Sequence, residues 1–302
     1  MIDLEVRLNN VKRIFNIEKI LNRDVKNPEE IARYYRLNRP IYWLFLSRDG
    51  FVHLASKRHE TSGINYFAPA DFVSKYIKTN DAHMILELGA GKGGNLKYLA
   101  KRHSKIKFVG LDLPDGQFKI KHFKNHKNIE ALYGDYHDLK YFDDSSIDLI
   151  YIIEALVHAR NQLKVFKEVS RVLKPRGLLI LAQDNLTIPF SRLWPSEKLA
   201  FKLLHAGVMS AHDSRQYSDL KKSLESVGME LADGEDITAD VMSGLMRMDR
   251  QASWFIHHPH FLRIIDKILP NEITANVITP YLLRPMFERC ILKYHLTVAR
   301  KP

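Results

Sequence analysis

The sequence predicts an α/β fold in which helices cover both faces of a mostly parallel sheet. From residue 84 onward, short apolar segments alternate with segments of helical period, which is the pattern of strand–helix–strand units. A glycine-rich turn joins the first of these strands to a helix, as at the ligand-binding edge of such sheets. With 302 residues, 45% of them hydrophobic, the chain suffices for one large domain or for a catalytic domain with an added cap.

The N-terminal part of the chain reads as helical and lacks strand alternation. Apolar residues recur at helical spacing between residues 14 and 21. Asn27 and Pro28 form a helix start, with asparagine as the N-cap and proline as the first helical residue. A short helix is expected at residues 71–77. We therefore predict a helical lid segment over residues 1–78.

The central part contains five apolar segments of strand length separated by helical ones. Helices are expected at residues 95–102 and 162–173, between successive strands. Because helices connect the strands, the strands should run parallel. The expected strands span residues 84–88, 107–111, 129–133, 147–153 and 178–182.

The C-terminal part is less regular but still belongs to the domain that we expect over residues 79–302. Gly228 is a plausible helix stop, because glycine tolerates the left-handed conformation that ends many helices. We expect helical cap insertions around residues 186–215 and 238–288. The expected elements are helices at 190–204, 218–227 and within 238–286, and strands at 229–232 and 291–299.

The charge balance is basic, with 46 Lys and Arg against 35 Asp and Glu and a formal net charge of +11. Such a surplus attracts nucleic acid, acidic lipid or phosphorylated molecules, but scattered charges are equally typical of an ordinary soluble surface. The single cysteine, Cys290, excludes an internal disulfide, and we expect it to be buried. No apolar run has the length of a membrane span and the first residues lack a signal-peptide pattern, so a cytoplasmic enzyme is expected.

The glycine-rich turn provides the strongest signal for a ligand. Gly89, Gly91 and Gly93 stand at alternate positions after a buried strand and before a helix. Glycines allow a tight turn and a close approach of the backbone to a ligand. Their spacing differs from the Gly-X-Gly-X-X-Gly of pyrophosphate cradles, which favours a cofactor without a pyrophosphate. Taken alone, the turn is also compatible with a nicotinamide or flavin enzyme, or with a purely structural role.

Carboxylates at the ends of the next two strands narrow this choice. Asp112 ends the second strand about twenty residues past the glycines, where ribose hydroxyls are accepted in such folds. Asp135 and Tyr136 follow the third strand. A carboxylate and an aromatic ring at this position are suited to accept the amino hydrogens of adenine and to cover its face.

With these features together, the sequence resembles the class I S-adenosylmethionine-dependent methyltransferases, in particular their small-molecule and lipid branch. Residues 144–148 (DSSID) and 168–177 (EVSRVLKPRG) look like the segments before that family's fourth and fifth strands. Residues 151–159 (YIIEALVHA) are similar to a stretch of sterol side-chain and tocopherol methyltransferases. The resemblance covers residues 80–184 and implies a Rossmann-like, seven-stranded sheet that binds S-adenosylmethionine.

The resemblance also implies roles for individual residues, carried over by position in the motifs. Tyr34 and Tyr35, on the helix after Asn27, either fold over the cofactor or form a pair that packs helices together. The implied cofactor-binding residues are Glu87, Gly89, Ala90, Gly91 and Gly93 around the methionine part, Asp112 at the ribose hydroxyls, Leu113, Asp135 and Tyr136 at the adenine, Gln117, which matches a glutamine often found after the acidic strand end in this branch, and Ile153, Glu154 and Tyr34 around the site.

Methyl transfer from a sulfonium is a direct displacement with a neutral leaving group, so the protein mainly aligns the reactants. A base is required only where the acceptor must lose a proton. Glu154 and His158 follow the fourth strand four residues apart, and we expect them on one turn of helix. Both are catalytic candidates, one as proton acceptor or substrate anchor. The alternatives are that Glu154 only contacts the cofactor and that His158 is a packing residue.

The leading hypothesis is methylation of a small, largely apolar acceptor of terpenoid, polyketide or lipid type, at carbon, oxygen or nitrogen; the basic surplus also allows an amphipathic or anionic acceptor. A nucleic-acid methyltransferase is disfavoured, because residues 153–156 read Ile-Glu-Ala-Leu in place of Asn/Asp-Pro-Pro-Tyr/Phe. A cofactor-free scaffold subunit is disfavoured by the intact glycines and Asp112. The oligomeric state stays open.

Two features of the tail have less specific interpretations. No metal site is expected at His257, His258 and His260, because Pro259 interrupts them and no acidic or cysteine partner is near; we expect a solvated loop. Several large apolar residues either line a substrate cavity or pack helices together: Trp194, Met242, Met246, Met248, Trp254, Phe255 and Phe261.

Overall fold

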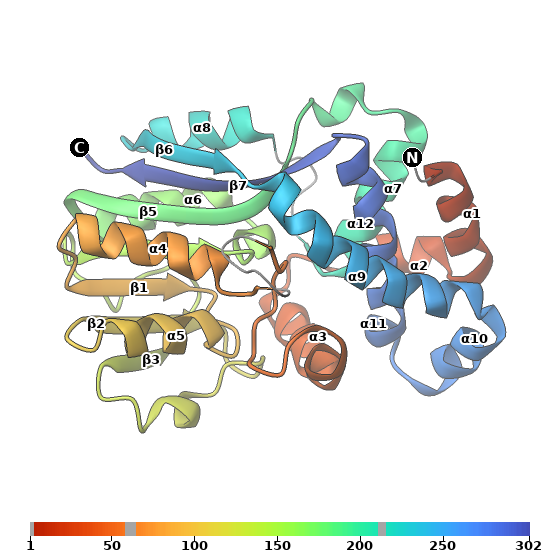
Figure 1. Ribbon diagram of the computed structural model, residues 1–302, viewed down its shortest axis with the longest axis horizontal. Coiled ribbons are helices and arrows are strands. Elements are labelled where there is room, and N and C mark those ends of the chain that lie inside the picture. The colour runs from red at the N-terminus through yellow and green to blue at the C-terminus, as the bar shows by residue number, and fades with distance from the viewer. Residues whose placement is uncertain (1–2, 58–64, 211–215) are drawn as a thin grey trace.

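The computed structural model describes residues 3–57, 65–210 and 216–302, which form a seven-stranded sheet beside a lobe of helices (Figure 1). The strand order is β3-β2-β1-β4-β5-β7-β6, and the predicted Rossmann-like α/β fold is confirmed. The strands are β1 (Met84–Leu88), β2 (Lys107–Asp112), β3 (Ile129–Tyr133), β4 (Ile147–Ile153), β5 (Leu173–Leu186), β6 (Glu230–Asp236) and β7 (Leu292–Arg300).

The first five strands are parallel, and β7 runs antiparallel between β5 and β6. The chain winds outward from β1 to β3 and then returns to place β4 on the other side of β1. The carboxyl ends of β1 and β4 therefore flank the switch point, which is where sheets of this kind bind ligands.

Both faces of the sheet are buried, which explains why its central strands read as continuous apolar runs. In β1, Ile85 belongs to one hydrophobic cluster, whereas Leu86 and Leu88 belong to the cluster on the opposite face. Helices α4 and α5 contribute to the first cluster, and α6 and α8 to the second. These helices span Ala68–Thr79 (α4), Gly94–Arg102 (α5), Gln162–Val172 (α6) and Tyr217–Glu225 (α8).

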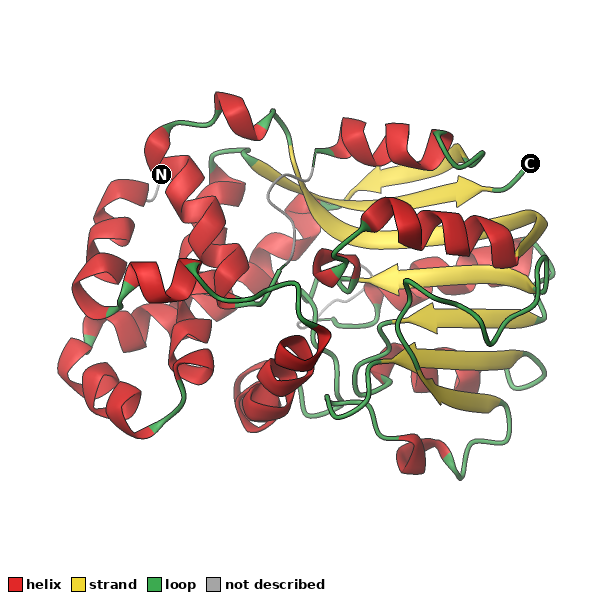
Figure 2. Ribbon diagram, turned by 180° about the vertical axis from the view of Figure 1, so that it is seen from behind, coloured by secondary structure: helices red, strands yellow, loops and turns green. Residues whose placement is uncertain are grey.

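The remaining helices gather at the end of the sheet to which the parallel strands point (Figures 1 and 2). They come from both ends of the chain: α1 and α2 contact α7, and α12 contacts α7 and α9. Helix α3 (Pro28–Ile41) runs on into the π-helical turn Tyr42–Leu46 between this lobe and the sheet. The lobe contains α1 (Leu4–Ile14), α2 (Ile17–Leu21), α7 (Pro195–Gly207), α9 (Thr238–His257), α10 (Pro259–Ile268), α11 (Asn271–Thr274) and α12 (Ile278–Glu288).

The helix ends predicted at Asn27 and Gly228 are confirmed, whereas the long helical stretches are divided into more helices than predicted. The Asn27 side chain accepts a hydrogen bond from the Glu29 amide (2.9 Å), and Gly228 has the left-handed φ of +77°. The helix predicted at 190–204 begins only at Pro195, because proline favours the first helical position. The helical stretch predicted within 238–286 divides into four helices.

Two expectations about single residues are wrong. Cys290 is exposed, because it lies in the turn between α12 and β7 with a φ of +55°. The expected solvated loop around Pro259 is helical: His257 ends α9 and Pro259 begins α10, although the three histidine side chains are exposed. In the described part of the chain, no helix combines the length and apolar character needed to cross a membrane.

Candidate active site

The glycine turn after β1 is held in a conformation that favours glycine. Gly89, Gly91 and Gly93 have φ values of +73°, +56° and +73°. A Cβ at Gly89 would lie 2.3 Å from that of Ala155, and one at Gly93 would overlap the Phe123 ring. No other described atom lies within 4 Å of a Cβ built at Gly91. Two glycines thus permit close packing, and Gly91 leaves space for a ligand.

Asp112 lies at the end of β2 and faces this turn. Its carboxylate accepts hydrogen bonds from the Gly91 amide (2.5 Å) and the Leu113 amide (2.6 Å). Burial raises the pKa of Asp112 to about 6, although these two hydrogen bonds lower it. The carboxylate is thus held in place before any ligand hydroxyl reaches it.

Glu87 lies on β1 directly before the turn, where it is buried. The Tyr151 hydroxyl of neighbouring β4 donates a hydrogen bond to it (3.0 Å). Burial nevertheless raises the pKa of Glu87 to about 8, with Tyr151 opposing the shift. The side chain is therefore largely protonated at neutral pH, and a cationic group nearby would favour its ionised form.

A cavity of about 90 Å³ lies between the ends of β1, β2, β3 and β4 on one side and α3 on the other. Both buried amide atoms of Gln117, which borders it, have no hydrogen-bond partner among the described residues. Of the residues expected at the cofactor, Gly89, Gly91, Asp112, Leu113, Gln117, Asp135, Tyr136, Ile153 and Glu154 line this cavity.

Four expected residues do not line this cavity. Glu87, Ala90 and Gly93 lie behind its wall in the described structure. The Tyr34 side chain is fully buried, and its hydroxyl is 2.6 Å from that of Tyr42. It therefore packs against the turn that follows α3 and does not border the cavity. Its neighbour Tyr35 borders the cavity in its place.

Asp135 is more strongly engaged than its sequence position suggested. Its carboxylate contacts Arg160 (2.7 Å) and accepts a hydrogen bond from His137 (2.5 Å). Although burial raises its pKa, these partners hold the pKa of Asp135 well below its ordinary value. His137 and Arg160 also line the cavity and were not predicted; their only signal was their place after strands β3 and β4.

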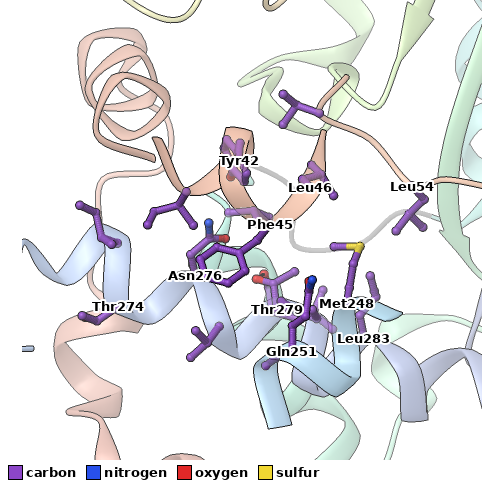
Figure 3. A pocket seen from close by; sticks show the side chains of 18 of the residues that line it. Tyr42, Phe45, Leu46, Leu54, Met248, Gln251, Thr274, Asn276, Thr279 and Leu283 are labelled. Atoms are coloured by element: carbon purple, nitrogen blue, oxygen red, sulfur yellow. Dashed lines mark hydrogen bonds between the residues drawn. The ribbon is translucent and has the colours of Figure 1, made fainter. Parts of the chain in front are cut away.

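A second, larger cavity of about 390 Å³ lies between the sheet and the helical lobe (Figure 3). Its lining is mostly apolar and comes from the 41–46 segment, α7, α9, α10 and α12. Of the tail residues considered above, Met248 and Phe255 line it, whereas Trp194, Met242, Met246, Trp254 and Phe261 are not part of its described wall. Polar wall residues include His53, Asp184, His205, Gln251, Asn276 and Thr279.

The two cavities share four lining residues: Tyr35, Val52, Glu154 and His158. Glu154 follows β4 with a φ of +49°, and one of its carboxylate oxygens accepts hydrogen bonds from the Leu54 amide (2.8 Å) and the Tyr294 hydroxyl (2.7 Å). Glu154 and His158 do not share a turn of α-helix, because Leu156–His158 is a 3-10 turn, but both reach this junction.

Both ring nitrogens of His158 have hydrogen-bond partners. Its Nδ1 lies 2.9 Å from the carbonyl oxygen of Met209, which can only accept, so Nδ1 carries a proton. Its Nε2 lies 2.7 Å from the Tyr35 hydroxyl, from which a neutral imidazole would accept a hydrogen bond. Burial raises the pKa of Tyr35 well above its ordinary value, which keeps the phenol protonated.

Comparisons with known proteins agree with this architecture. A family model described as a methyltransferase domain matches residues 86–181. A 24-methylenesterol C-methyltransferase 2 of Arabidopsis thaliana is 27% identical over 189 residues, 60% of this chain and 52% of the relative. A sterol 24-C-methyltransferase of Aspergillus fumigatus is 36% identical over 113 residues, 35% of this chain and 29% of the relative. The chain thus spans about half, or less, of the length of these relatives.

Solved structures extend the likeness in fold to nearly the whole chain. The cyclopropane synthase MmaA2 of Mycobacterium tuberculosis has a TM-score of 0.72 at 14% identity, covering 92% of this chain and 100% of that one. Geranyl diphosphate C-methyltransferase of Streptomyces coelicolor has a TM-score of 0.60 at 12% identity, covering 93% and 99%. The [4+2]-cyclase SpnF has a TM-score of 0.69 at 17% identity, covering 91% and 96%. The fold is therefore shared among proteins of different chemistry.

Proposed function

We propose that this chain, whose residues 86–181 match a methyltransferase domain, is a class I S-adenosylmethionine-dependent methyltransferase that methylates a small, largely apolar acceptor. The observation that carries the proposal is the junction of two unlike cavities. A narrow, carboxylate-bearing cavity at the strand ends meets a wide apolar one at Tyr35, Glu154 and His158. A polar donor and an apolar acceptor would meet there.

The residues of the smaller cavity fit S-adenosylmethionine. Gly91 leaves room for the ligand beside the backbone, Asp112 offers a buried carboxylate for the ribose hydroxyls, and Gln117 has an unpaired buried amide. When bound, the cofactor supplies a methyl group on a sulfonium, which departs as a neutral thioether. Glu87 would gain stability as a carboxylate beside the positive charges of the cofactor.

The larger cavity suits an acceptor that is apolar over most of its length and carries a polar group, because its wall is mostly apolar with several polar side chains. We favour a carbon acceptor, since the curated relatives are named as sterol C-methyltransferases. Methylation of an alkene carbon forms a new C–C bond and leaves a cation on the acceptor. The Glu154 carboxylate at the junction would stabilise that cation in a cavity of low polarity.

The Tyr35–His158 pair offers a route for the proton that the acceptor must lose. The Tyr35 oxygen can accept that proton while its own hydrogen passes to Nε2 of His158. The resulting imidazolium would be stabilised by the Met209 carbonyl, which already accepts from Nδ1. This route starts from the neutral Tyr35 phenol and requires that the His158 imidazole is neutral before the proton is transferred.

The test is calorimetric titration with S-adenosylmethionine, followed by incubation with methyl-labelled cofactor and a panel of isoprenoid alkenes and lipid extracts. We expect saturable binding and transfer of label into an apolar fraction. Asp112→Ala should weaken cofactor binding by about 1–3 kcal/mol, because a charged hydrogen-bond acceptor is lost. An absence of binding heat would instead indicate a scaffold, and label in RNA would indicate the nucleic-acid alternative.

A further inference from the structure

Helix α10 has two apolar edges, of which only one faces the protein. Leu262, Ile265 and Leu269 line the larger cavity. Phe261, Ile264 and Ile268 follow the same spacing one position earlier, and they are 45%, 59% and 74% exposed. The helix therefore separates the cavity from the outside by a single layer, with apolar side chains on both sides of it.

A neighbouring tryptophan enlarges the exposed edge. Trp254, near the end of α9, is 51% exposed, and its ring lies 5.8 Å from that of Phe261. Single exposed apolar residues are common, but a row of large ones on a single helical edge marks a surface that contacts an apolar medium. Tryptophan is typical of interfaces between apolar and aqueous phases.

The charges around this edge are cationic. Arg263 and Lys267 are exposed on α10 itself, and Arg263 donates a hydrogen bond to the Arg13 carbonyl of α1 (2.9 Å), which brings exposed Arg13 alongside. The one carboxylate on this helix, Asp266, is turned toward α11, where it accepts hydrogen bonds from Thr274 and Asn271. An apolar edge flanked by cations matches an anionic lipid surface.

We propose that α10 and the end of α9 dock on an anionic membrane surface. Trp254, Phe261, Ile264 and Ile268 enter the acyl region, and the flanking cations contact the headgroups. The cavity wall then lies against the bilayer, so an apolar acceptor reaches the cavity from lipid without crossing water. Uptake of the acceptor from lipid rests on the proposed function, whereas membrane docking depends only on the exposed edge of α10 and its flanking cations.

The test is co-sedimentation of the full chain with phosphatidylcholine vesicles that contain or lack phosphatidylserine. We expect binding to the anionic vesicles, weakened at least about tenfold by the double variant Ile264→Asp/Ile268→Asp. The control is Leu163→Asp on α6, which removes another exposed apolar side chain (39% exposed) on a helix outside the lobe and should leave binding unchanged. Arg263→Glu/Lys267→Glu should remove the preference for phosphatidylserine.

Thermal melting of each variant shows whether it is folded, because the substituted side chains are exposed. Equal vesicle binding by wild type and the Ile264/Ile268 variant would overturn the proposal. So would a dimer detected by light scattering that this variant abolishes, combined with no vesicle binding, since a second copy would then cover the surface. Vesicle binding without any methyl transfer would retain the docking surface and reject the proposed function.

Discussion

The two cavities that meet at Glu154 are built in opposite ways. The smaller one is formed largely by the ends of four successive strands, so most of its residues occur in short motifs between residues 89 and 160, and α3 and Val52 supply the rest. The larger one is formed by helices from both ends of the chain, including the 41–46 segment and α12. A site at strand ends can be predicted from short stretches of sequence, whereas a site between helices depends on how elements distant in the sequence pack together.

The two sides also differ in charge. The smaller cavity holds Asp112 and Asp135, with Glu87 close behind, and burial acts on the pKa of each. The wall of the larger cavity is mainly aliphatic and aromatic (Figure 3). Substitutions on the first side should therefore act on cofactor binding and pH dependence, and those on the second side on acceptor binding.

The largest expected effect is that of Gly91→Val, which would place a branched side chain in the space beside the turn. The backbone there has a φ of +56°, which adds strain for any other residue. We expect cofactor affinity to fall by more than about 100-fold, because the valine side chain would occupy the space that Gly91 leaves for the cofactor. Gly228→Val is the control: its φ is +77° and its surroundings are open, but it lies after α8.

The next effect concerns the junction itself. Glu154→Gln keeps an oxygen that can accept from Leu54 and Tyr294 but removes the charge. We expect kcat to fall by roughly 100-fold or more, from lost stabilisation of a cationic acceptor, with cofactor affinity nearly unchanged. The control is Asp184→Asn. Asp184 lines the larger cavity but not the smaller one, so its substitution should lower kcat less. An equal loss of kcat in the two variants would contradict a special role for the junction.

A cavity-narrowing variant tests the acceptor side alone. Met248 points into the larger cavity, so Met248→Trp should raise the KM of the acceptor by about tenfold, because filling a cavity competes directly with its ligand. Cofactor affinity should stay the same. The matched control, Met246→Trp, changes an exposed methionine on the same helix. A changed cofactor affinity in Met248→Trp would contradict the separation of the two sides.

The last effect, which leaves the acceptor side untouched, is on stability and comes from Glu87. Its pKa is about 8 in the folded chain against 4.5 ordinarily, so between these values the folded state holds a proton that the unfolded state releases. The free energy of unfolding should fall as pH rises through this window, by at most about 1.4 kcal/mol per pH unit. Chemical denaturation of ligand-free Glu87→Gln should lack this component. If the free energy of unfolding depended on pH in the same way in wild type and Glu87→Gln, the contribution of Glu87 would be excluded.

Much of the sheet was predictable because its signals are local. Strands β1 to β4 match the predicted segments within a residue. Three of them, β1, β2 and β4, are buried on both faces and therefore largely apolar, whereas β3 is only partly buried. The glycine turn and Asp112 were likewise recognised from residues adjacent in the sequence, and they lie together because parallel strands end at the same edge. The roles assigned to them remain predictions.

The helical parts show what the sequence left open. Tyr34 and Tyr35 are adjacent and similar, and only the packing of α3 decides that Tyr35 borders the site while Tyr34 is buried. Helix α10 reads simply as apolar, and only the lobe decides which of its two edges lines a cavity and which faces outward.

The sequence by itself determined the strands, the glycine turn and the carboxylates that follow them, because each depends on a few neighbouring residues. Tertiary structure alone decided the larger cavity, the junction at Tyr35 and His158, and the exposed edge of α10. The physical reason is that a helix presents side chains all around its axis, so its neighbours, which lie far away in the chain, select the face that becomes a wall.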